Sequence, residues 1–137
     1  MILVSQQASA GQYQHAQFAT ADRGRLLLLM FDGALRFLAQ AESALQSDRI
    51  EEFVDQLGRA QAVIAELLRD LTARLVIERV QQLDRLYRFM LEHLVEANVQ
   101  KSPRHVAQVR HLMTTIADSY REILAQGMPQ LGARDAA

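Results

Sequence analysis

Apolar residues recur along most of this chain at alternating intervals of four and three residues, the spacing of a helix face that packs in a bundle. Four such rows follow one another. In chain order they are Leu27, Phe31, Ala34, Leu38, Ala41 and Leu45; Phe53, Leu57, Ala60, Ile64, Leu67 and Leu71; Val76, Val80, Leu83, Tyr87, Met90, Leu94 and Ala97; and Val106, Val109, Met113, Ile116, Tyr120 and Ile123. Because only six glycines and two prolines interrupt 137 residues, the rows predict an all-α protein.

Residues that precede three of the rows have the character of helix starts. Asp22 is a suitable N-cap for the first helix. Asp48, with Glu51 three residues later, has the form of a capping box for the second helix. Ser102 followed by Pro103 is the pattern of an N-cap and a first helical residue, so the fourth helix is expected to begin there.

The ends of the helices carry weaker signals. Asn98 tolerates the left-handed backbone of a helix end, so the third helix is expected to stop there. Residues 71–75 contain no breaker, but a turn is expected there because an unbroken helix of roughly 50 residues would be ~75 Å long. The predicted architecture is an antiparallel four-helix bundle over residues 22–126, with a mobile N-terminal arm over 1–21 and a short disordered tail over 127–137.

Composition and charge exclude several kinds of protein. The chain has no cysteine, so thiolate metal sites and disulfides are ruled out. Fifteen basic and 16 acidic residues leave a net charge of -1, and Arg85 and Arg88 share their helix with acidic residues, so no nucleic-acid partner is expected. No signal peptide or membrane span is recognisable, which predicts a soluble protein of the cytosol.

Catalytic and metal-binding chemistry is poorly provided for. The serines lie at helix ends or on polar faces, and glycine is too sparse for a phosphate-binding loop, so we expect no enzyme and no cofactor. Glu92, His93 and Glu96 approach a carboxylate–histidine metal motif but in the reverse order, and no metal site is predicted. Phosphotransfer through His105 or His111, or metal binding by the bundle, remains the alternative function.

Six consecutive apolar residues, 26–31, surround the first helix on all sides for more than a turn. A second apolar row therefore lies beside the core row on that helix, formed by Leu26, Met30, Gly33 and Phe37. The third helix has a similar extra row that includes Leu86 and Phe89. These rows are either further core or a docking surface. Methionine is frequent on surfaces that accept flexible partners, and Gly33 permits close approach of a backbone, which favours docking.

The order of motifs resembles the FliS family, the flagellar export chaperones of flagellin. The resemblance rests on Tyr13 and on residues 18–21, 26–38, 59–61, 64–67, 83–90 and 96–98. The apolar run that ends in Phe31-Asp32-Gly33-Ala34 is its centre. Two features depart from the family pattern: Val76-Ile77 stand where a Gly-Gly turn is frequent, and Asp22-Arg23 where Ser-Pro is frequent.

The resemblance implies a function for the extra apolar rows on the first and third helices. Such chaperones bind the disordered C-terminal region of newly made flagellin in the cytosol of a flagellated bacterium, prevent its premature polymerisation and help deliver it to the type III export apparatus. Components of the export gate are further expected partners, and a homodimer of the free protein is left open. A tyrosine like Tyr13 is expected to cover the groove until flagellin arrives. The predicted partner-binding residues are Tyr13, Leu26, Met30, Phe31, Gly33, Phe37, Leu83, Leu86, Tyr87, Met90 and Leu94.

Overall fold

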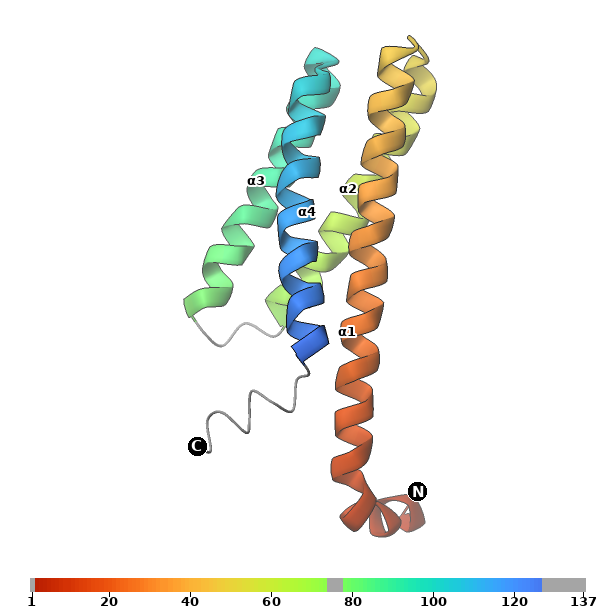
Figure 1. Cartoon of the computed structure of the whole chain (residues 1–137), viewed down its shortest axis with the longest axis vertical. Coiled ribbons are helices and arrows are strands. Elements are labelled where there is room, and N and C mark those ends of the chain that lie inside the picture. The colour runs from red at the N-terminus through yellow and green to blue at the C-terminus, as the bar shows by residue number, and fades with distance from the viewer. Residues whose placement is uncertain (1, 74–77, 127–137) are drawn as a thin grey trace.

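The computed structural model describes the backbone of residues 2–73 and 78–126, and the side chains of residues 22–71 and 82–126. Four helices make up these ranges: α1 (Ile2–Gln46), α2 (Ile50–Ala73), α3 (Glu78–Gln100) and α4 (Pro103–Gln126). They run alternately up and down, and the described ranges contain no strand (Figure 1). The predicted antiparallel four-helix bundle is confirmed.

The helices are arranged in a ring in which each one packs against two others. α1 contacts α2 and α4, and α3 contacts α2 and α4. α1 and α3 therefore stand diagonally across the bundle, and within the described residues their backbones do not come close to one another. This arrangement matters for function, because apolar rows on α1 and on α3 line separate grooves on opposite sides of the molecule.

The core follows the predicted rows closely. Phe31, Ala34, Leu38 and Ala41 of α1 are buried, and so are most residues of the rows on the other three helices. The buried core residues beyond those four are Ala44, Phe53, Leu57, Ala60, Ile64, Leu67, Leu68, Tyr87, Met90, Leu94, Ala97, Val106, Val109, Met113 and Ala117. The row residues that are partly buried and pack against the core are Leu27, Leu45, Leu71, Leu83, Ile116 and Tyr120. Ile123 is an exception: it is 42% exposed, near the last described turn of α4. Val76 and the side chain of Val80 lie outside the described residues.

The start of the first helix differs from the prediction. α1 begins at Ile2, so Asp22 lies inside it and is not an N-cap. Residues 2–21 contain no proline and are rich in alanine and glutamine, so nothing in them stops the helix from continuing. Figure 1 shows this part of α1 extending beyond the end of the bundle. Its mobility stays a prediction.

Two other helix ends also differ from the prediction. Asp48 has a φ of 58° and follows α1, so it belongs to the end of α1 and is not the N-cap of α2. α3 continues past Asn98 to Gln100, and Lys101 takes the left-handed conformation with a φ of 51°. The predicted start of α4 is confirmed, since Ser102 Oγ accepts a hydrogen bond of 3.3 Å from the His105 backbone N–H.

Two predicted regions fall wholly or partly outside the described residues. α2 continues through Leu71 to Ala73, so the first three residues of the turn expected at 71–75 are helical, and residues 74–77 are not described. The tail predicted over 127–137 is likewise outside the described residues. No helix in the described part is both long and apolar enough to cross a membrane.

Candidate partner-binding grooves

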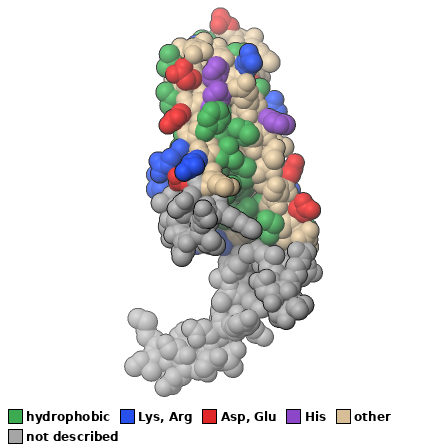
Figure 2. Space-filling view, turned by 90° about the vertical axis from the view of Figure 1, so that its left-hand side faces the viewer, with side chains coloured by type: hydrophobic (Ala, Val, Ile, Leu, Met, Phe, Trp, Pro, Cys, Tyr) green, Lys and Arg blue, Asp and Glu red, His purple; other side chains and the backbone are tan. Residues whose placement is uncertain are grey.

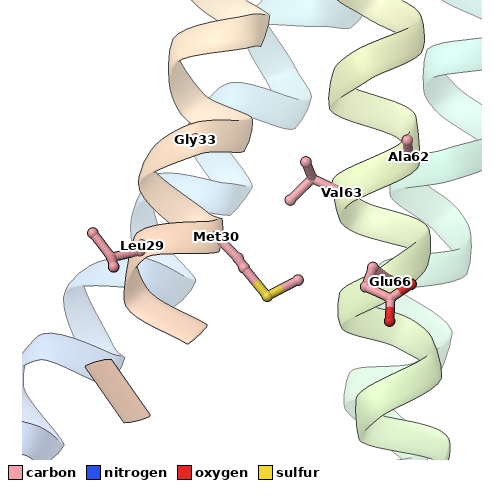
Figure 3. A pocket seen from close by; sticks show the side chains of 6 residues that line it. All are labelled: Leu29, Met30, Gly33, Ala62, Val63 and Glu66. Atoms are coloured by element: carbon pink, nitrogen blue, oxygen red, sulfur yellow. The ribbon is translucent and has the colours of Figure 1, made fainter. Parts of the chain in front are cut away.

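An open groove lies between α1 and α2. We call it the α1–α2 groove; it has a volume of about 380 Å³ and is lined by Leu29, Met30 and Gly33 from α1 and by Ala62, Val63 and Glu66 from α2. Met30 reaches from α1 toward α2, and Val63 points back toward α1 (Figure 3). Most of this lining is apolar, so the groove suits an apolar side chain or the face of an amphipathic segment.

Gly33 keeps this groove open. A Cβ placed on Gly33 would have only the Arg36 guanidinium nearby, with Nη2 at 3.9 Å, so no other side chain fills the space above the glycine. Leu26 and Leu29, one turn apart on the same helix, are 57% and 66% exposed. The apolar run of residues 26–31 therefore supplies Phe31 to the core and leaves two leucines on the surface.

The charge of the α1–α2 groove is concentrated in one carboxylate. Glu66 Oε2 accepts a hydrogen bond from Arg69 Nε of the next turn at 3.2 Å, so its charge is partly balanced by its own helix. Polar groups elsewhere hold α1 in place: Arg23 pairs with Asp70 of α2, and Glu42 pairs with Arg110 of α4. The hydrogen bond to Glu42 raises the pKa of Arg110.

The structure separates the predicted partner-binding residues into two groups. Met30 and Gly33 line the α1–α2 groove, Leu26 is exposed beside it, and Phe37 is half-buried. Ala62, Val63 and Glu66 complete the groove but were not predicted. Val63 and Ala62 lie off the core row of α2, and an apolar residue off that row was the only signal in the sequence.

The second group is part of the core, which corrects the prediction. Phe31, Tyr87, Met90 and Leu94 are at most 3% exposed because they belong to the rows that face the bundle axis. They cannot rim a surface groove in this conformation. Burial also raises the pKa of the Tyr87 phenol, and of the half-buried Tyr120 phenol, because an apolar environment disfavours the phenolate.

The other three predicted partner-binding residues are Leu83, Leu86 and Tyr13. Leu83 and Leu86 are half-buried and pack against the core on α3, on the opposite side of the ring from the α1 residues. The side chain of Tyr13 lies outside the described residues. The backbone around it belongs to the part of α1 beyond the end of the bundle, and its role as a cover for the groove stays a prediction.

A second groove, larger than the first, lies between α3 and α4. This α3–α4 groove has a volume of about 610 Å³ and is lined by Phe89, Arg104, Ala107, Gln108, His111 and Leu112. Figure 2 shows apolar side chains gathered in a stripe along this face, with histidines beside it. The extra row predicted on α3 therefore contributes Phe89 to a real surface feature, although not to the one predicted for α1.

Two of the histidines considered for chemistry form a stacked pair above the α3–α4 groove. The His93 and His105 rings are 4.3 Å apart, and the Phe89 ring stacks on the other side of His93 at 5.0 Å. His93 Nε2 lies 2.5 Å from Gln108 Oε1, and His105 Nδ1 lies 2.7 Å from Ser102 Oγ. Among the residues with described side chains, no three histidine, cysteine, aspartate or glutamate residues are grouped to hold a metal ion.

Comparison with known proteins identifies the family of this chain. The family model described as "Flagellar protein FliS" matches residues 5–127. This chain belongs to the FliS family. The resemblance inferred from the motifs is thereby confirmed.

Relatives of this FliS-family chain come from several bacteria. It is 33% identical over 113 residues to "Flagellar secretion chaperone FliSB" of Pseudomonas aeruginosa, and the matched region covers 80% of this chain and 90% of the relative. It is 30% identical over 112 residues to "Flagellar secretion chaperone FliS" of Bacillus subtilis, covering 82% and 83%. The Escherichia coli protein of the same name is 30% identical over 124 residues, covering 85% and 91%.

Proposed function

We propose that this FliS-family chain is a cytosolic export chaperone that binds the disordered C-terminal region of flagellin. Binding would prevent premature polymerisation and assist delivery to the flagellar type III export apparatus. The role is one of binding and not of catalysis. The observation that carries the proposal is the α1–α2 groove, in which the exposed Leu29 and the half-buried Met30 and Val63 leave an apolar surface that the bundle does not fully cover.

The physical mechanism is occlusion. Disordered segments that pair with one another through apolar faces remain available for polymerisation until those faces are covered. An amphipathic segment laid against Met30 and Val63 would bury its apolar side chains there and not against another flagellin. Gly33 would let the backbone of the segment approach α1 closely. The cost of ordering the segment reduces the net affinity, so contacts along a long stretch of flagellin are needed.

The experiment is a titration of the full chain with a peptide that spans the flagellin C-terminal region, followed by calorimetry and light scattering. A one-to-one complex that suppresses flagellin polymerisation is expected. In Leu29→Glu, a charge enters the α1–α2 groove, and affinity should fall by about tenfold or more. Leu29 is 66% exposed, so this substitution should leave the bundle folded.

The matched control is Val99→Glu. Val99 is 74% exposed at the far end of α3 and does not line the α1–α2 groove, so the same change of an apolar residue to glutamate should leave flagellin binding intact. Equal losses in the two variants would contradict the proposed groove. Absence of any complex with the wild-type chain would contradict the proposed function as a whole.

A further inference from the structure

The α3–α4 groove differs in charge from the α1–α2 groove. Its lining contains the Arg104 guanidinium and the His111 imidazole and no carboxylate. Among the residues whose side chains the structure describes, neither of these two groups forms an ion pair. The charged residue that lines the α1–α2 groove is instead Glu66. The lining of the α3–α4 groove thus holds cationic and imidazole groups without a carboxylate, whereas the α1–α2 groove has Glu66 in its lining and the Arg36 guanidinium beside Gly33.

The two grooves are also far enough apart around the ring to be filled at the same time. α1 and α2 form one side of the ring, and α3 and α4 form the opposite side. A segment seated beside Met30 and Val63 has no need to touch Phe89 or Leu112, since no helix contributes to both grooves. Occupation of one groove therefore leaves the other open.

The shape of the α3–α4 groove indicates what kind of segment it accepts. Phe89 is 48% exposed although it is a large aromatic residue, and Leu112 is half-buried next to it. The apolar stripe follows the long axis of two antiparallel helices (Figure 2). A third helix can lie along such a stripe and cover it with residues spaced by three and four positions.

We propose that the α3–α4 groove is a second docking surface, which binds an acidic amphipathic helix of a protein other than the client in the α1–α2 groove. The apolar face of that helix would cover Phe89 and Leu112. Its carboxylates would pair with the Arg104 guanidinium and accept a hydrogen bond from a ring N–H of His111 at the edge of the groove. This inference goes beyond the proposed function: it gives the chain a second docking surface that stays open when the α1–α2 groove is filled.

A pair of designed peptides tests the proposal with the full chain. Each is an amphipathic helix of about 18 residues, or five turns, with leucine on one face. One carries glutamate on its polar face and the other carries lysine at the same positions. Fluorescence anisotropy should show tighter binding of the acidic peptide, and added salt should weaken it. The net charge of the chain is -1, so a preference for the acidic peptide cannot come from the overall charge.

Two substitutions locate the binding. Phe89→Ala should weaken the acidic peptide about tenfold by removing the apolar anchor. Arg104→Glu should weaken it by a similar factor, and a glutamate in the first turn of α4 favours the helix end, so this variant stays folded. Arg36→Glu on α1 makes the same change in net charge away from the α3–α4 groove, and it should leave binding of the acidic peptide unchanged.

Three results would overturn the proposal. The first is equal affinity for the two peptides or an equal effect of Arg104→Glu and Arg36→Glu, because the charge at the groove would then not matter. The second is competition between the acidic peptide and a flagellin C-terminal peptide, which would mean that the client itself fills the α3–α4 groove. The third is a dimer in sedimentation velocity that Phe89→Ala dissociates, which would mean that a second copy covers the groove. Simultaneous binding of both peptides to a monomer supports it, and the preference for the acidic peptide over the basic one is measured without flagellin, so a failure of the proposed function is distinguishable from a failure of this inference.

Discussion

Asp48 and Lys101 hold the same left-handed backbone conformation at the same end of the bundle, with φ angles of 58° and 51°. Asp48 lies two residues after the end of α1 and Lys101 one residue after the end of α3, and both make the same pair of turn bonds. The Asp48 N–H bonds to the Leu45 carbonyl at 3.1 Å and the next N–H, that of Arg49, to the Ala44 carbonyl at 2.8 Å. The N–H groups of Lys101 and Ser102 bond in the same way to the carbonyls of Asn98 and Ala97. Both helices therefore end in a Schellman motif without glycine.

This pairing predicts unequal effects of glycine at the two positions. Glycine removes the strain of a left-handed residue, so Asp48→Gly should raise the free energy of unfolding by about 0.5–1 kcal/mol. Lys101→Gly should gain less, because Lys101 Nζ donates to the Asn98 carbonyl and side-chain oxygens at 2.8 Å each and lies 5.7 Å from the Phe53 ring centre. Urea unfolding of the two variants checks the order. A larger gain for Lys101→Gly would show that these side-chain contacts contribute nothing.

Alanine substitutions at Gly24, Gly33 and Gly58, the three helical glycines whose surroundings are described, should differ in their effect on stability. Gly33→Ala and Gly58→Ala should each stabilise the bundle by about 0.5–1 kcal/mol, because alanine favours the helix and neither new Cβ has a close neighbour. Gly24→Ala should gain less, because its Cβ would come 2.6 Å from Leu124 Cδ2 and the leucine would have to move. Thermal unfolding followed by circular dichroism gives the comparison.

The same variants separate stability from binding in the α1–α2 groove. Gly33→Ala should weaken the flagellin peptide even as it stabilises the fold, since the new methyl group occupies the space left for a partner. Gly58→Ala is the control, with the same gain in helix propensity outside the groove. If Gly33→Ala binds the peptide as tightly as Gly58→Ala does, then close approach at Gly33 is not part of recognition.

Buried tyrosines predict a loss of stability in alkali. The folded state raises the pKa of Tyr87, chiefly through desolvation, from an ordinary value of 10.0. Below about pH 10 the phenol is neutral in both the folded and the unfolded state, so its ionisation does not change the free energy of unfolding. Above that pH the phenol ionises in the unfolded chain but stays neutral in the folded one, which stabilises the unfolded state. Stability should then fall by about 1.4 kcal/mol per pH unit for a fully protected tyrosine.

Urea unfolding between pH 8 and about pH 11 measures this fall. Tyr87→Phe should reduce its slope, and Tyr120→Phe should reduce it less, because Tyr120 is only half-buried. An unchanged slope in Tyr87→Phe would show that another group is responsible for the loss.

Some features of the core and of the α1–α2 groove were predictable from the sequence, and others were not. The spacing of Phe31, Leu38 and Leu94 predicts which side of each helix is buried, because a residue that recurs at 3.6-residue intervals must lie on one face. Met30 and Gly33 stood out because they lie beside that face. Glu66 and Val63 did not, because nothing in α2 indicates which neighbouring helix will stand across from it.

The sequence by itself determined the helices, their buried faces and the family, since all three depend on the order and spacing of residues along one chain. The tertiary structure decided which helices are neighbours. Four similar amphipathic rods can be placed in a ring in more than one order, and only the packed arrangement puts α1 diagonally opposite α3. For that reason the apolar rows that looked like one binding surface are two, with Glu66 at the edge of one and Arg104 at the edge of the other.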